Sequence, residues 1–339
     1  MTAPTPALEH SLALPAPTAH ADTPASESAP PAYQHLQLPS VDSPWRYAWA
    51  YGRAAWVSLL GPHRLRQGAS DHYSAPMHIS LRLGHRWRAL FDVPARAAPQ
   101  VPLLSNESVA TLMQARLFAD LGVNMRHVAH LQHRTVHHAA VAEHTRSRDQ
   151  RLSCHVQRVL RLGEHRVMIE VRTVVHDAGG QLLSEVDDGF LVDQLPADQL
   201  AGLPSDRVLL RELLGARRRL PRLSTVVGEA RLAEMPVPAS MGRRYGRIAG
   251  NLNPVHCCRL GAWLMGLQRP CLQALALRNL VVRHLAELGV AMDRLALTFA
   301  APALLGQMLM LVVDGEEIEV HDAKGHLVAF GSACNACGD

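Results

Sequence analysis

A seven-residue pattern that occurs twice is the feature that most constrains how this chain of 339 residues folds. Residues 176–182 read HDAGGQL and residues 321–327 read HDAKGHL. In both copies an Asp-Ala-x-Gly sequence stands between two apolar runs. This is the chemistry of a β-hairpin, because glycine adopts a positive φ without steric cost. One matching turn can arise by chance, but the surroundings of the two copies also match.

Each copy follows a segment with the apolar pattern of a helix. The first segment spans 108–121, with Ser105 or Asn106 available as its cap and Gly122 at its end. Four of its apolar residues fall on one helical face, at the spacing of a buried helix rather than of a cofactor site: Val109, Leu112, Met113 and Leu117. The second segment spans 271–288 and ends at Gly289.

Four extended segments surround each copy of the repeat. In the first half they are 130–136, 153–162, 166–175 and 182–192, and in the second half 294–299, 307–313, 316–320 and 327–332. One helix followed by a run of antiparallel strands, given twice, predicts a duplicated α+β chain. We expect each helix to be wrapped by a curved sheet, which is the double-hotdog arrangement.

Composition shifts give the expected domain boundaries. Residues 1–44 are rich in Pro, Ala, Ser and Thr and are predicted to form a disordered tail. The N-terminal hotdog-like domain is expected at 45–195 and the C-terminal one at 239–339. The linker, 196–238, is expected to contain a short helix at 207–214 but no other continuous element, because five prolines interrupt it: Pro196, Pro204, Pro221, Pro236 and Pro238.

The overall composition excludes several classes of protein. Apolar residues make up 48% of the chain, enough for a core in each half, and the net charge of +4 is modest with scattered arginines. We therefore expect no nucleic-acid partner. The apolar runs are shorter than the ~20 residues of a membrane helix. No Lys or Arg precedes Arg46, so a secretory signal is not expected. These features predict a cytoplasmic protein without a membrane partner.

The cysteines and histidines do not predict a metal site. Six cysteines in so long a chain are expected as free thiols, and the pair Cys334 and Cys337 lacks the second pair that structural zinc requires. The histidines of 127–138 include His133 and His137, which in an extended segment share a face but lie too far apart to share a metal. We expect a surface or interface run of histidines there, and neither a metal nor a cofactor.

Residues 244–256 read RYGRIAGNLNPVH. This stretch resembles the signature of the MaoC-like, R-specific enoyl-CoA hydratases and dehydratases, Tyr-x-x-x-(Ser/Ala)-Gly-Asp-x-Asn-Pro-(Ile/Leu/Val)-His. Seven positions match: Tyr245, Ala249, Gly250, Asn253, Pro254, Val255 and His256. The resemblance extends over about 236–333, including the sequence LTFAAP at 297–302 and then Gly306. The first half is similar only in layout.

The resemblance implies an acyl-thioester hydratase or dehydratase, a lyase of fatty acid metabolism. Such a reaction needs one base for water and one proton for the α-carbon. In the family, an Asp and a His five positions apart hold the water. His256 falls on that His and is the expected base, while Asn251 stands in place of the catalytic Asp. An amide binds water but carries no proton at neutral pH.

The substrate-binding residues implied by the resemblance are Tyr245, Asn253, Gln273 and Ala274. A backbone N–H at the start of the second helix would stabilise the thioester oxyanion. There Gln273 replaces the family's His and Ala274 its Gly. The Ala274 methyl group is expected to crowd the thioester, since glycine allows the closest approach. Asn253 is expected to pin the loop backbone.

The expected partner is a 2-enoyl or 3-hydroxyacyl thioester of CoA or acyl carrier protein, with its arm between the two halves. Arg243, Arg244 and Arg247 are candidates for phosphate contacts. Three readings stay open beside this one: a non-catalytic protein that binds an acyl thioester or a partner hotdog protein, which the departures from the motif favour, a thioesterase, and a purely structural His256. A homodimer is also left open. Cys257 and Cys258 are expected to pack in the core rather than act as nucleophiles.

Overall fold

The computed structural model describes residues 34–35, 63–66, 72–78, 81–93, 107–138, 149–206, 230–290 and 292–335. The chain divides into two units, 1–32 and 33–339, and every described residue belongs to the second. Several expectations lie outside the described residues: nearly all of the tail, the caps Ser105 and Asn106, the short helix at 207–214, and Cys337.

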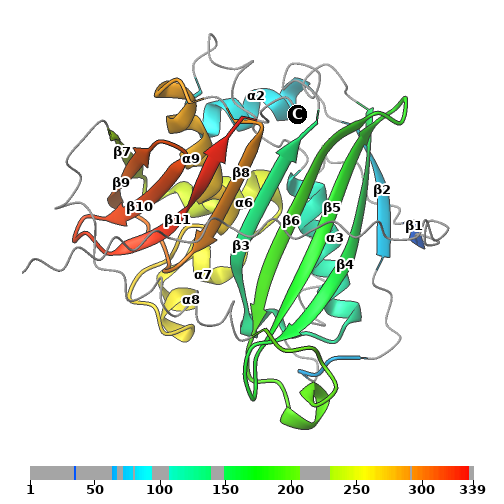
Figure 1. The fold of residues 1–339 in the computed structure, drawn as a ribbon. Coiled ribbons are helices and arrows are strands. Elements are labelled where there is room, and N and C mark those ends of the chain that lie inside the picture. Colours follow the sequence, from blue (N-terminus) through cyan, green and yellow to red (C-terminus); the bar gives the residue numbers. More distant parts are fainter. Residues whose placement is uncertain are drawn as a thin grey trace, which may run out of the picture. The chain divides into compact units, whose positions relative to one another are not determined.

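The described strands form one sheet with the order β1-β2-β4-β5-β6-β3-β8-β11-β10-β9-β7 (Figure 1). In the first half the strands are β1 (Gln34–His35), β2 (His72–His78), β3 (Val128–His137), β4 (Asp149–Arg161), β5 (Val167–Asp177) and β6 (Leu182–Val192). In the second half they are β7 (Arg231–Val237), β8 (Arg294–Phe299), β9 (Gln307–Asp314), β10 (Glu317–Asp322) and β11 (Leu327–Cys334).

The strand order is the same in both halves when it is followed outward from the centre. It runs β3-β6-β5-β4-β2 on one side and β8-β11-β10-β9-β7 on the other. The central strands β3 and β8 pair antiparallel, with Gln132 opposite Thr298 and Val136 opposite Arg294. We call this pairing the seam. Apart from the short outermost strand β1 of the first half, each half has one strand before its long helix and four after it, so the predicted duplicated α+β, double-hotdog fold is confirmed.

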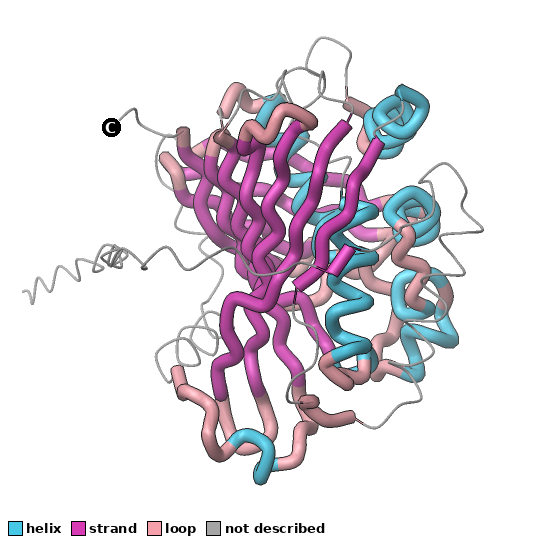
Figure 2. The backbone as a smooth tube through the Cα atoms, turned by 90° about the vertical axis from the view of Figure 1, so that its right-hand side faces the viewer, coloured by secondary structure: helices cyan, strands magenta, loops and turns pink. Residues whose placement is uncertain are grey.

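The long helices α3 (Glu107–Asp120) and α9 (Ala274–Glu287) each span 14 residues and lie on the same side of the sheet (Figure 2). Both are buried around most of their circumference, as is expected of helices enclosed within a core. Both end two residues before the glycines that were predicted to end them, Gly122 and Gly289, whose φ values are 74° and 72°. The positive φ lets the chain turn away from the helix axis.

The shorter elements surround these helices. They are α2 (Leu81–Leu90), α6 (Met241–Ala249), α7 (Pro254–Cys257), α8 (Arg259–Leu264), and the 3-10 turns η1 (Met125–His127) and η2 (Ala197–Leu200). No helix among the described residues is both long and apolar enough to cross a membrane.

The repeated seven-residue pattern forms the same turn in both halves. Asp177 Oδ1 accepts the backbone N–H of Gln181 at 2.8 Å, and Asp322 Oδ1 accepts that of His326 at 2.9 Å. The glycines Gly180 and Gly325 have φ values of 87° and 79°. The strand register also shifts just before both turns. The two copies of the pattern therefore form equivalent turns, as the sequence predicts.

The expected linker differs from the structure in its last residues. Strand β7 occupies Arg231–Val237 within it and pairs with β9 along its whole length, with Pro236 opposite Met308. The proline count was misleading because β7 is an edge strand, where a residue without an N–H is tolerated. Strand β2, which the sequence analysis did not predict, likewise carries Pro76.

Close packing across the β8–β11 pair yields a prediction. A Cβ on Gly331 would lie 1.8 Å from the carbonyl oxygen of Ala296, whereas a Cβ on Gly163 would meet no atom within 4 Å. We expect Gly331→Ala to destabilise the fold by at least the ~1–3 kcal/mol typical of overpacking. Gly163→Ala, the control, should leave stability nearly unchanged. Denaturant unfolding of both variants measures this, and equal midpoints would contradict the packing at the β8–β11 pair.

Candidate functional site

The motif segment forms a tight loop between α6 and α7. Gly250 ends α6 with a φ of 76°. The Asn253 side chain caps α7 by accepting the backbone N–H of Val255 at 3.2 Å, as a helix N-cap does. Asn251 Oδ1 in turn accepts the backbone N–H of Asn253 at 3.4 Å. The two asparagines thus hold the backbone that leads into His256, which agrees with the role expected for Asn253.

Two glycines of α6 allow this helix to pack closely against the loop. A Cβ on Gly242 of α6 would lie 2.1 Å from the carbonyl oxygen of His256, and one on Gly246 would lie 2.5 Å from that of Asn251. These contacts leave no room for a side chain. The position of the loop is therefore fixed by backbone-to-backbone packing.

His256 is held in one orientation by the backbone. Its Nδ1 donates to the carbonyl oxygen of Cys271 at 2.9 Å, so the second ring nitrogen, Nε2, carries a lone pair. Nε2 takes part in no hydrogen bond with the residues that the structure describes. Burial lowers the pKa of His256 to about 4 and outweighs the hydrogen bond to Cys271, which raises it. The imidazole is therefore neutral at pH 7 and able to accept a proton.

His256 lines a cavity of about 580 Å³ to which both halves of the sheet contribute. From the first half come residues of α3, β3 and β6, among them Gln114, Phe118, His130 and Phe190. From the second half come the motif loop, the start of α9, the end of β8 and the segment after it, among them Asn251, Ala274 and Phe299. A mostly apolar cavity with a few polar groups is the usual form of a small-molecule site.

The start of α9 lies at this cavity. Ala274 is its first residue, and the first N–H groups of a helix have no partner within the helix, which favours an anionic group there. Gln273 precedes it and is only 2% exposed. Its Nε2 donates to the carbonyl oxygens of Gly242 at 2.9 Å and Asn251 at 3.3 Å. Gln273 thereby fastens the motif loop to the start of α9.

Tyr245 links the two halves through its hydroxyl group. The hydroxyl donates to Glu107 Oε2 at 3.0 Å, and Asn279 Nδ2 donates to both oxygens of the same carboxyl group at 3.1 and 3.0 Å. Nη1 of the buried Arg278 lies 4.0 Å from Glu107 Oε1. Burial raises the pKa of Glu107 to about 7, although Arg278, Tyr245 and Asn279 all act to lower it.

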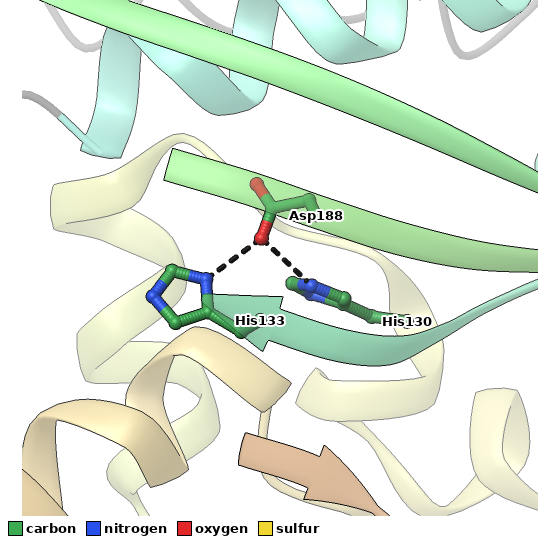
Figure 3. Close-up of side chains that lie close together, drawn as sticks. All are labelled: His130, His133 and Asp188. Atoms are coloured by element: carbon green, nitrogen blue, oxygen red, sulfur yellow. Dashed lines mark hydrogen bonds and ion pairs between the residues drawn. The ribbon is translucent and has the colours of Figure 1, made fainter. Parts of the chain in front are cut away.

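A second buried cluster joins β3 and β6 (Figure 3). Asp188 Oδ1 accepts hydrogen bonds from His133 Nδ1 at 2.7 Å and His130 Nε2 at 3.0 Å. Its other oxygen accepts Gln114 Nε2 at 2.6 Å. Burial alone would raise the pKa of Asp188, but His130 and His133 together outweigh it and lower the pKa.

This cluster corrects the expectation of a surface or interface run of histidines for two of its members, which are buried within the chain. His133 is 1% exposed and His137 is 7% exposed. The β3–β6 register shifts between His130 and Gln132, which brings His130 and His133 to the same carboxylate. The donor atoms of His130, His133 and Asp188 lie within 4.8 Å of one another, so among the described residues these three could hold a metal ion.

The expectation for the adjacent cysteines was wrong for Cys258. Its side chain is exposed, and its Sγ accepts the backbone N–H of Gly261 at 3.4 Å as the N-cap of α8. Cys257 is partly buried, and burial raises the pKa of its thiol. Cys271, beside His256, is buried and its pKa is raised to about 11 by burial. The thiols of Cys257 and Cys271 therefore stay protonated and lack the character of nucleophiles.

All six residues predicted from the motif line the one cavity: Tyr245, Asn251, Asn253, His256, Gln273 and Ala274. Their roles toward a substrate stay predictions. The sequence analysis missed Glu107, Asp188 and the role of His130. A signal was present for the network around Glu107, because Arg278 and Asn279 interrupt the apolar helix ALALRNLVV. Charged residues within such a helix are rarely buried without a partner.

The comparisons with known proteins establish the fold. No protein-family model matches the chain, and no curated protein matches it by sequence. Among solved structures, HtdX of Mycobacterium tuberculosis superposes with a TM-score of 0.57 at 15% identity, covering 78% of this chain and 99% of that one. A MaoC-like dehydratase from Phytophthora capsici gives 0.57 at 12% identity, covering 83% and 98%. Full-length peroxisomal multifunctional enzyme type 2 from Drosophila melanogaster gives 0.52 at 16%, covering 79% and 49%.

The buried carboxyl group of Glu107 yields a prediction on stability. Its folded pKa of about 7 lies above the ordinary value of 4.5, so the folded state binds the proton more tightly than the unfolded state does. The protonated carboxyl group therefore contributes to the free energy of unfolding. This stabilisation is complete below about pH 4.5 and is lost as the pH rises to about 7. The loss is about 3 kcal/mol at most, from 1.36 kcal/mol per pKa unit. Relative to wild type, Glu107→Gln should therefore gain stability over this pH range.

Denaturant unfolding of wild type and Glu107→Gln at a series of pH values measures the difference, in which the other titrating groups cancel. Glu164→Gln, which changes an exposed carboxylate in the β4–β5 turn, is the control and should show no such trend. A stability difference that stays constant from pH 4.5 to 7 would contradict the raised pKa of Glu107.

Proposed function

We propose that this chain adds water to a 2-enoyl thioester, or removes it from a 3-hydroxyacyl thioester, carried on CoA or acyl carrier protein. One observation carries the proposal. His256 presents a neutral Nε2 in a cavity that it shares with Ala274, the first residue of α9. A base for water and backbone N–H donors for the thioester oxygen are two of the elements that this reaction needs, beside a proton for the α-carbon.

In this proposal the base and the N–H donor act on different atoms of the reactants. In the hydration direction, Nε2 of His256 takes a proton from water as the water oxygen bonds to C3 of the acyl chain. The C2–C3 π electrons move onto the thioester oxygen, and the resulting enolate collapses when C2 takes a proton. The backbone N–H of Ala274 stabilises this developing negative charge, since helix starts favour anions. The mostly apolar lining of the cavity suits the acyl chain.

Asn251 supports binding of water rather than transfer of a proton. Its Oδ1 is engaged by the backbone N–H of Asn253, and an amide exchanges no proton at neutral pH. This engagement is also the observation that favours the second candidate function, a protein that binds an acyl thioester without transforming it. Turnover assays distinguish the two candidates.

The outer face of α6 suits the charged end of the carrier. Arg243, Arg244 and Arg247 are exposed there, and α6 leads directly into the motif loop. Guanidinium groups bind phosphate groups by charge-assisted hydrogen bonds. A thioester arm entering between the two halves would carry its phosphate groups near these side chains.

Removal of the His256 imidazole tests the proposal. With crotonyl-CoA and longer 2-enoyl-CoAs, we expect wild type to consume the conjugated double bond, as measured by its ultraviolet absorbance. His256→Ala should lower kcat by about a hundred- to ten-thousand-fold, the usual contribution of a general base. His326→Ala, which removes an exposed histidine of the repeated turn, is the control. An unchanged rate in His256→Ala would refute the site, and release of free thiol would indicate a thioesterase.

The substituted Asp position gives a second test. Asn251→Asp should raise kcat, by up to about a hundredfold, because the carboxylate can still accept the Asn253 N–H and can also transfer a proton. Asn251→Ala, the matched control, removes the side chain and should not raise the rate. A silent wild type with an active Asn251→Asp would favour the non-catalytic candidate for the natural chain. No gain in Asn251→Asp would show that position 251 does not face the reacting atoms.

A further inference from the structure

A second histidine reaches the same cavity from the first half of the chain. His130 lies on β3 beside the seam and lines the cavity, with its side chain 13% exposed. Its ring stacks on Phe190, with centroids 4.6 Å apart, and meets Phe299 of the second half at 5.4 Å. The ring is therefore fixed in position where the two halves meet.

Asp188 determines which nitrogen of His130 is available. Nε2 lies 3.0 Å from Asp188 Oδ1 and 2.9 Å from the backbone carbonyl oxygen of Gln132, and both are acceptors. Nε2 therefore carries a proton and donates it. Nδ1 takes part in no hydrogen bond with the residues that the structure describes. Figure 3 shows the carboxylate held between the two imidazoles.

The other side chains that bind Asp188 are not able to transfer a proton to the cavity. His133 donates through Nδ1 to Asp188 and accepts the Thr135 hydroxyl group at Nε2, at 2.7 Å, so both of its nitrogens are occupied. Gln114 has no titratable proton. His130 is thus the imidazole of the cluster that lines the cavity and has a ring nitrogen, Nδ1, without a hydrogen-bond partner among the described residues. In general, a carboxylate bound to an imidazole stabilises the imidazolium ion that takes part in proton transfer.

We propose that His130, positioned by Asp188, is the second proton-transfer residue of the cavity and supplies the proton that Asn251 cannot. This inference rests on the proposed hydratase or dehydratase function. It assigns the two proton transfers to different halves of the duplicated chain: His256 serves the water and His130 serves the α-carbon, C2.

The proposed step balances as follows. His256 removes a proton from water, the water oxygen bonds to C3, and the C2–C3 π electrons move into the thioester as an enolate. The enolate collapses as C2 takes the Nδ1 proton of His130. His256 then holds one extra proton and His130 one fewer, and a proton passes back between them through water. Dehydration runs through the same steps in reverse.

A metal ion on His130, His133 and Asp188 is the competing explanation. It is disfavoured because the two imidazole nitrogens lie at hydrogen-bond distances from a single carboxylate oxygen, at 2.7 and 3.0 Å. Nε2 of His130 also faces a second acceptor, the carbonyl oxygen of Gln132. Both features match protons between the groups better than a shared cation.

The variant His130→Gln tests the proposal. A glutamine amide can still donate to Asp188 but carries no exchangeable proton for C2. The matched control is His138→Gln. His138, which directly follows β3, pairs with Glu185 of β6 at 2.8 Å and therefore bridges the same two parts of the sheet, but it does not line the cavity.

With 2-enoyl-CoA substrates, His130→Gln should lower kcat by about a hundredfold or more while KM and the unfolding midpoint change little, and His138→Gln should match wild type. Asn251→Asp added to His130→Gln should restore part of the rate. Its gain should exceed the gain from Asn251→Asp alone, because the new carboxylate then supplies the missing proton. A merely structural role of His130 would give no such rescue.

Three outcomes overturn the inference. If His130→Gln retains the wild-type rate while His256→Ala is inactive, the proposed function stands and the role of His130 falls. If wild type, His130→Gln and Asn251→Asp are all inactive with every enoyl and 3-hydroxyacyl thioester tested, both fall together. If metal analysis of purified wild type finds one bound transition-metal ion that His130→Gln lacks, the three side chains form a metal site.

Discussion

The antiparallel pairing of β3 with β8 is the contact on which the rest of the structure depends. It joins the six described strands of the first half to the five of the second, in the same order apart from β1, and both long helices lie on one side of the resulting sheet. The cavity draws its lining from both halves only because the seam brings them together. Without the seam, His130 and His256 would belong to separate sites.

A buried polar network reinforces the seam from the helix side. Glu107 of α3 binds Tyr245 of α6 and Asn279 of α9, so the two halves are also tied within the core. Such a network adds less to stability than its number of bonds suggests, because each polar group gives up its hydration. Its larger effect is on specificity, since a shifted packing of the helices would leave buried polar groups without partners.

The sequence predicted those features that follow from local chemistry. The repeated turn, the glycine helix ends and most strands depend on neighbouring residues, and they lie where the patterns placed them. Strand β7 was missed because the tolerance of Pro236 depends on β7 being at the edge of the sheet. The motif likewise predicted the loop from Asn251 to His256, whose bonds are mostly local. The pairing of Asp188 with His130 and His133 could not be predicted from the sequence, because it depends on the strand register and on the irregularity between His130 and Gln132.

The first residues of the two long helices differ in a way that breaks the internal symmetry. Ala274 begins α9 and Glu107 begins α3, at equivalent places in helices of equal length. A carboxyl group already occupies the start of α3, bound to Tyr245 and Asn279, so an anionic ligand there would meet its charge or its bulk. The fold is duplicated, but the helix start that favours an anionic group is present in the second half and occupied by a carboxyl group in the first. The two halves are therefore not interchangeable: the second half presents the start of its long helix to the cavity, whereas the first half contributes side chains to the cavity lining.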